Sequence, residues 1–137
     1  MMGLKTLLLV SLLGILVLGV VSRSTVLVPG APFPINNNDP GLQKALVVAI
    51  NHYNTKSNDA FLYRISSIKK AESQLVAGTL YIVDLVISRT VCRKPPSDQN
   101  LSKCNFQAPR KTLQCHVKVL VVPWLKQTTT LEFSCKA

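Results

Sequence analysis

The sequence predicts an α+β fold, in which one amphipathic helix covers one face of an antiparallel β-sheet. A helical spacing of apolar residues occurs once, between residues 40 and 53, and an alternation of period two dominates after residue 61. Four cysteines lie in the C-terminal half, as expected for a small exported domain that is stabilised by disulfides. At 137 residues, the chain has the length of one domain.

Residues 1–22 are expected to be a secretory signal peptide. Lys5 precedes an apolar run over residues 6–21, and Val20 and Ser22 suit cleavage after Ser22, with Gly19 as the second choice. An uncleaved membrane anchor is the alternative, but the run is short for a span of about 20 residues. We therefore expect a secreted, extracellular domain over residues 23–137 that meets a membrane only through its cleaved signal.

An extended arm and a helix are predicted to open the mature domain. The prolines of residues 23–38 forbid a regular helix there. Asn38 or Asp39 can cap the helix that follows, and Pro40 suits its first turn. The polar segment 54–59 ends it. Its predicted apolar face, widened by Val47 and Val48, consists of Leu42, Ala45, Leu46, Ala49, Ile50 and Tyr53.

Four strands follow in the predicted order. The first covers residues 62–71, and the second, over residues 79–91, is apolar on both faces and is expected to be central. The first two strands should be joined around residues 72–78. Residues 93–110 read as a loop. The last two strands, joined around residues 122–126, alternate through Leu113, Cys115, Val117, Val119 and Val121, and then through Thr129, Leu131 and Phe133.

The cysteines are expected to form two disulfides, because their number is even and the chain is exported. Three connectivities are open, of which the sequential one closes two short loops without threading. Zinc is not expected, because the chain has no CxxC pair and its two histidines are scattered. We expect no metal and no cofactor.

Three apolar segments are unusual for exposed positions. Trp124 follows Pro123 at a predicted hairpin tip, where it either folds back as a core plug or anchors an interface. The turn 75–78 is apolar, whereas Asn-Gly or Asp-Gly would be commoner in a hairpin turn. The alternative to an exposed apolar turn is a plain hairpin in which Leu75 or Val76 points inward. Residues 26–30 form an apolar patch on the arm. Together they could form one narrow ridge suited to a partner's cleft.

These segments carry a family resemblance. Gln74-Leu75-Val76-Ala77-Gly78 matches the Q-x-V-x-G motif of cystatins, and Pro123-Trp124 matches their second-hairpin motif. Gly30 lies where the family has its N-terminal glycine. With a signal peptide and four C-terminal cysteines, the chain resembles the secreted type 2 cystatins over its whole mature length.

The resemblance implies a cystatin-like fold, with about five antiparallel strands wrapped around one long helix and the first strand supplied by the arm. It also implies the disulfides Cys92–Cys104 and Cys115–Cys135. The implied activity is reversible, tight inhibition of papain-like cysteine peptidases, cathepsins included, by a wedge that fills the active-site cleft. On this reading Val28, Pro29 and Gly30 lie along the non-primed subsites, residues 74–78 near the catalytic cysteine, and Pro123-Trp124 on the primed side.

Two expectations follow from the wedge. Pro29 stands where the family often has a bulky hydrophobe, so we expect weaker dependence on the arm and a preference for peptidases that accept proline. Replacement of Gly78 by arginine is expected to weaken inhibition with little loss of fold.

Other features suggest further roles. Ser57-Asn58-Asp59 resembles the tripeptide by which some secreted cystatins inhibit legumain, with Asn58 in the specificity pocket; an ordinary polar loop is the alternative. Asn100-Leu101-Ser102 is a glycosylation sequon in a predicted exposed loop.

Rival functions are less consistent with the sequence. An enzyme is not expected, because His52 and His116 have no evident nucleophile beside them. The net charge of +10 drops by one when Lys5 is removed, and basic residues at 69–70, 93–94, 103 and 110–111 could bind anionic membranes, glycosaminoglycans or microbial surfaces. A cationic host-defence protein, as in the cystatin-like cathelicidin precursors, is thus the alternative. Nucleic acid is not expected, and we expect a monomer.

Overall fold

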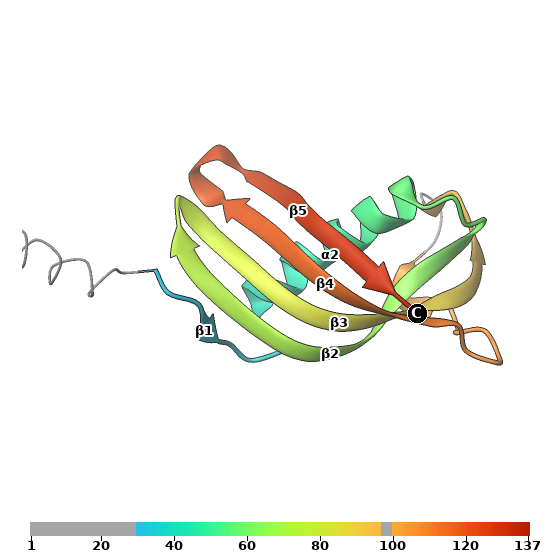
Figure 1. The fold of residues 1–137 in the computed structure, drawn as a ribbon. Helices are drawn as coiled ribbons and strands as arrows, with labels where there is room; N and C mark the ends of the chain where they lie inside the picture. Colours follow the sequence, from blue (N-terminus) through green and yellow to red (C-terminus); the bar gives the residue numbers. More distant parts are fainter. Residues whose placement is uncertain (1–29, 97–99) are drawn as a thin grey trace, which may run out of the picture.

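The computed structural model describes residues 30–96 and 100–137 of the chain. Five antiparallel strands form one sheet in the order β1-β2-β3-β4-β5, and helix α2 lies across one face of it (Figure 1). The predicted α+β class is confirmed, and so is the first strand from the arm: β1 (Phe33–Pro34) pairs with Ser73 and Glu72. The signal peptide predicted over residues 1–22 lies outside the described residues. None of the described helices has both the length and the apolar character needed to cross a bilayer.

Helix α2 (Pro40–Lys56) begins as its sequence predicts. The Asp39 carboxylate accepts a hydrogen bond from the backbone N–H of Leu42, which satisfies one of the unpaired donors of the first turn. The expectation that Val47 and Val48 widen the apolar face is wrong, because these side chains are 58% and 38% exposed. The sheet contacts only the narrower stripe, since a helix lying on a sheet buries one side.

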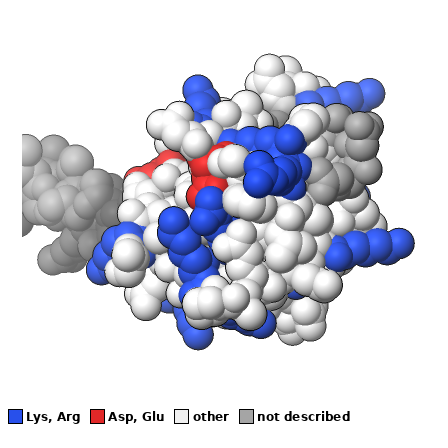
Figure 2. Space-filling view, turned by 90° about the vertical axis from the view of Figure 1, so that its right-hand side faces the viewer, with Lys and Arg blue, Asp and Glu red and all other residues white. Residues whose placement is uncertain are grey.

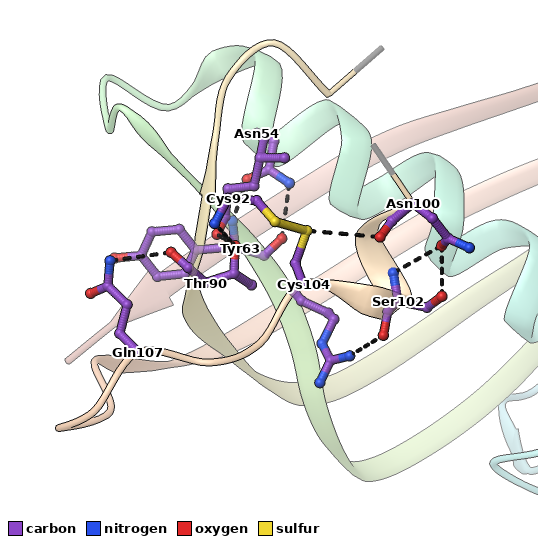
Figure 3. Close-up of a disulfide and its surroundings, with 10 residues drawn as sticks. Asn54, Tyr63, Thr90, Cys92, Asn100, Ser102, Cys104 and Gln107 are labelled. Atoms are coloured by element: carbon purple, nitrogen blue, oxygen red, sulfur yellow. Dashed lines mark hydrogen bonds between the residues drawn. A yellow bond between two sulfur atoms is a disulfide. The ribbon is translucent and has the colours of Figure 1, made fainter. Parts of the chain in front are cut away.

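Asn54 is buried, although the sequence groups it with the polar end of the helix. Its side-chain oxygen accepts a hydrogen bond from the backbone N–H of Tyr63, and its amide donates to the Tyr63 carbonyl, both at 2.9 Å (Figure 3). The side chain therefore takes the place of a neighbouring strand for this stretch of β2 (Phe61–Val76). A buried peptide group without partners would be unfavourable, so this residue joins helix to sheet.

Replacement of Asn54 by alanine is expected to destabilise the fold by about 3 kcal/mol, because it leaves a buried N–H and a buried C=O of Tyr63 without partners. Urea unfolding followed by circular dichroism measures the change. The matched control is Asn51→Ala on the exposed side of the same helix, which should change stability by less than about 0.5 kcal/mol. Equal effects of the two variants would contradict the assigned role.

Strands β2 and β3 (Gly78–Arg93) form the long central hairpin, and β3 is central as predicted. Their pairing shifts register three times along β2, between Phe61 and Tyr63, Ile65 and Ser67, and Ile68 and Lys70. Such bulges increase twist and bend a strand, which lets the sheet curve around the helix.

Strands β4 (Thr112–Val122) and β5 (Gln127–Lys136) complete the sheet. The predicted alternation of Thr129, Leu131 and Phe133 on one face is wrong. Val119 pairs with Thr130 and Lys118 with Glu132, so Leu131 is an extra residue at a bulge, and it is 56% exposed. Phe133 returns to the core side, where its ring lies 5.0 Å from that of Tyr53.

The core lies between the helix and the concave face of the sheet, and two disulfides secure one end of the molecule. Its buried side chains include Leu42, Leu46, Ala49, Val83, Leu85, Ile87, Val117 and Val119. Cys92 bonds to Cys104 and Cys115 to Cys135, so the pairing implied by the resemblance is confirmed. The first bond ties the loop 93–111, which carries the short helix η2 (Leu101–Lys103), to β3.

Candidate functional site

The predicted turn between the first two strands is shorter than expected. Strand β2 continues to Val76 and β3 starts at Gly78, so Ala77 alone forms the turn rather than the whole segment 72–78. Gln74 and Leu75 are strand residues that pair with Leu80 and Thr79. Leu75 is 66% exposed, so the side chain does not tuck inward at this hairpin.

Gly78 is required by the geometry of this hairpin. It is buried with φ at +120°, a region that other residues rarely adopt, and a Cβ at this position would clash with the carbonyl oxygen of Val121. The expectation that arginine here would leave the fold intact is therefore wrong: the substitution would strain the backbone and push β4 away. The absence of a side chain at Gly78 therefore lets the first hairpin lie directly against β4, the strand that leads to the second hairpin.

The second hairpin turns through the short helix η3 (Pro123–Leu125), which ends with Lys126 in the left-handed conformation at φ 51°. The N–H of Lys126 donates to the carbonyl of Pro123 at 3.0 Å and closes the turn. Trp124 is 68% exposed, which rules out the core plug and leaves the ring free for a partner.

The arm reaches the same edge. Gly30 has φ at +95°, and a Cβ there would clash with the carbonyl oxygen of Leu75, so the backbone of the arm lies directly against β2. Val28 and Pro29, the arm residues predicted to contact a peptidase, lie outside the described residues. Figure 1 shows the described start of the arm and both hairpin tips at one end of the molecule.

We call this surface the hairpin edge and define it as Gly30, Gln74–Gly78 and Pro123–Leu125. It holds no acid, base or thiol. Two further exposed apolar side chains are not among those predicted from the sequence: Leu125 of this edge, 58% exposed beside Trp124, and Phe33, 53% exposed on β1 next to the edge. The exposure of Leu125 could have been predicted, because it is an apolar residue inside a turn. The exposure of Phe33 could not, because the arm has no periodicity from which a buried face can be assigned. The edge can therefore fill an apolar cleft but cannot do covalent chemistry.

The tripeptide Ser57-Asn58-Asp59 lies at the opposite end of the molecule. The N–H of Ser57 donates to Tyr53 and ends α2, and the carbonyl of Ser57 accepts from the Lys94 ammonium at 2.6 Å. Asn58 itself is exposed. It therefore stands at the tip of a loop that is tied down on both sides.

Asp59 provides the second tie of this loop. Burial alone would raise the pKa of its carboxyl, but the N–H of Phe61, the hydrogen-bonded Arg89 guanidinium and the nearby Lys111 together lower that pKa below its usual value. Arg89 donates to Asp59 at 2.7 and 3.0 Å. The carboxylate is consequently charged at neutral pH and holds the loop against β3.

The sequon lies on the loop that the Cys92–Cys104 bond secures. Asn100 is exposed, and its side-chain oxygen accepts from the N–H of Ser102 at 3.1 Å and from its hydroxyl at 2.6 Å (Figure 3). The predicted exposure of this segment is confirmed.

The histidines do not form a catalytic site with the described residues. His116 lies on the outer face of β4, with Nδ1 2.6 Å from Asp84 Oδ1, and all four cysteines are paired in disulfides. Across residues 30–96 and 100–137, the His, Cys, Asp and Glu side chains form no group of three that could hold a metal ion.

Comparisons with known proteins agree with the geometry. Residues 30–124 match the family model described as the cystatin domain. Cystatin of Gallus gallus is 41% identical over 123 residues, covering 88% of this chain and 86% of the relative. Human cystatin-F is 39% identical over 101 residues, covering 72% and 69%. The crystal structure of dimeric human cystatin F superposes with a TM-score of 0.72 at 35% identity, covering 80% of this chain and 89% of that one.

Proposed function

Because the chain belongs to the cystatin family, whose members inhibit cysteine proteases and are not enzymes, we propose that it is a secreted, reversible, tight-binding inhibitor of papain-like peptidases, cathepsins included. The observation that supports this most is the hairpin edge, where the arm, the turn at Ala77 and Trp124 share one exposed apolar surface. In this proposal the secretory signal is residues 1–22 and the inhibitor domain residues 23–137.

The proposed mechanism is steric. Val28 and Pro29 lie along the non-primed subsites, Gly30 turns the chain away, Gln74–Gly78 approach the catalytic cysteine, and Pro123 and Trp124 cover the primed side. The turn at Ala77 is held by strand pairing on both sides, so little conformational freedom is lost on binding. No peptide bond of the edge needs to reach attack geometry, so the peptidase is blocked without cleavage.

Titration of active papain with the refolded, oxidised protein tests this proposal. We expect stoichiometric loss of activity that is recovered on dilution or displacement, because a preformed apolar wedge binds tightly without covalent chemistry. We also propose that the protein is a monomer, which light scattering on the protein without papain tests. Absence of inhibition at micromolar excess of correctly disulfide-bonded protein would overturn the proposal.

A second inhibitory site is proposed at Asn58, directed at legumain. What favours it is the exposed asparagine at the tip of a loop fixed by Lys94 on one side and by the Asp59–Arg89 ion pair on the other. A fixed loop can present one side chain to an asparagine-specific pocket at small entropic cost. Because the loop lies at the far end of β2 from the hairpin edge, we propose that the two sites act independently. Glycosylation at the exposed Asn100 is likewise a proposal.

A further inference from the structure

Seven basic side chains gather at the end of the molecule that is opposite to the hairpin edge. Figure 2 views the molecule from this side and shows several groups of Lys and Arg around a small acidic area. In the described parts of segments 57–64, 88–96 and 100–111, Asp59 is the only acidic residue. We call this surface the basic end and define it as Arg64, Arg89, Arg93, Lys94, Lys103, Arg110 and Lys111.

Two phenylalanine rings hold four of these arginines. The guanidinium carbons of Arg89 and Arg93 lie 4.6 and 4.7 Å from the centre of the Phe61 ring. Those of Arg64 and Arg110 lie 4.2 and 4.4 Å from the Phe106 ring. A cation over the face of an aromatic ring is attracted to it, and such contacts restrict long side chains that would otherwise move freely. The arginines are thus ordered before any ligand arrives.

The two arginine–phenylalanine groups belong to one surface because the loop 100–111 is bonded to β3. The carbonyl of Asn105 accepts from the N–H of Val91, Gln107 donates to Arg89, and Arg89 donates to Lys111, at 3.0 to 3.1 Å. The Cys92–Cys104 disulfide fixes the same loop at its other side. The positive charges therefore keep a set spacing rather than moving on a free loop.

The chemistry of the basic end points to one class of partner. Guanidinium groups bind sulfate and carboxylate oxygens in a planar, paired geometry, and a concentration of like charges favours a ligand with repeated anionic groups. Val91 is the only large exposed apolar side chain described in these segments, so little could insert into a bilayer. Nucleic-acid bases stack on open aromatic faces, whereas Phe61 and Phe106 already contact arginines. We propose that the basic end binds an extended sulfated polysaccharide.

Such binding would leave the inhibitor active. Strands β2 and β3 each run 16 residues from the basic end to the hairpin edge, which is roughly 50 Å at about 3.3 Å per residue. A polysaccharide held at one end need not cover the other. The protein would be retained on an extracellular matrix with its hairpin edge free, whereas the loop at Asn58 lies beside Lys94 and would be covered.

Binding of the full mature protein to heparin, measured by calorimetry and by salt elution from a heparin column, tests this proposal. The triple variant Lys103→Gln, Arg110→Gln, Lys111→Gln removes three exposed charges of the basic end and should weaken binding by about tenfold or more. The matched control, Lys44→Gln, Lys69→Gln, Lys70→Gln, removes three exposed charges elsewhere and should change it by less than about twofold.

Circular dichroism spectra that match the unmodified protein show that both triple variants are folded, whether or not the protein inhibits papain. If the two triple variants weaken heparin binding equally, the proposal is overturned, because heparin would then be attracted by net charge alone. The proposal would also be overturned if the protein bound phosphatidylserine vesicles but not heparin, and if this binding was lost in the basic-end variant. The partner would then be a membrane. On the unmodified protein, a papain-like peptidase that does not itself bind heparin should be retained on the column only when the inhibitor is present; failure of the complex to bind would refute separate surfaces.

Discussion

Replacement of Trp124 and Leu75 together by alanine is expected to weaken the inhibition of papain by about 100-fold or more. Both side chains are about two-thirds exposed, at 68% and 66%, so neither supports the core, yet both are placed to be buried in a partner's cleft. An aromatic anchor that becomes fully desolvated commonly accounts for 2 kcal/mol or more of binding, at roughly 1.4 kcal/mol for each factor of ten. The inhibition constant from progress curves measures the loss.

Leu131→Ala is the matched control for this double variant. Leu131 is also a large exposed apolar residue, at 56%, but its bulge in β5 lies away from the hairpin edge. We expect no change in its inhibition constant. An equal loss in the control, or full inhibition by the double variant, would contradict the assignment of the edge. Gly78 is less suitable for the test, since substitution there would deform the hairpin and confuse folding with binding.

Asn58→Ala is expected to abolish inhibition of legumain while leaving inhibition of papain unchanged. The asparagine side chain is the proposed specificity element, and its removal leaves the ties of the loop through Asp59 and Lys94 in place. We therefore expect the Asn58→Ala variant to lose recognition of legumain while its loop keeps its structure. Parallel assays of the two peptidases with one protein preparation give the comparison directly.

Asn105→Ala provides the control for this second prediction, because Asn105 is also exposed and lies at the same end of the molecule. It should leave both inhibitions unchanged. Loss of both activities in Asn58→Ala would contradict separate sites, and full legumain inhibition by that variant would show that Asn58 is not the specificity element.

Some elements could be predicted because the physical signal lies close along the chain. The helix start at Pro40 follows from a capping carboxylate one residue earlier, and the place of β3 in the sheet follows from apolar residues on both of its faces. Trp124 at a turn is predictable because a large apolar side chain conflicts with local turn chemistry. Each of these signals depends only on residues that are neighbours in the sequence. The structure has the helix start, the central strand and the turn at the predicted positions.

Other features depend on contacts that no local pattern contains. Leu131 is outside and Thr130 inside because the bulge shifts β5 relative to β4, and a shift of one residue exchanges the faces of a strand. Asn54 is buried because Tyr63 of another element has backbone groups to satisfy. Gly78 cannot readily be replaced by another residue, because the carbonyl of Val121, 43 positions further along the chain, lies against it.

Local patterns along the chain are enough to predict the α+β class, the helix, the strand periodicities and the motif residues of the hairpin edge, because propensity, capping and periodicity act over a few residues. Which residues meet at each end depends on the folded arrangement: Gly30, Ala77 and Trp124 share one edge, and seven basic residues share the other end. Those arrangements depend on strand register, on bulges and on a disulfide that join residues distant in the chain. Their physical origin is packing and backbone hydrogen bonding across the sheet, which local sequence patterns do not encode.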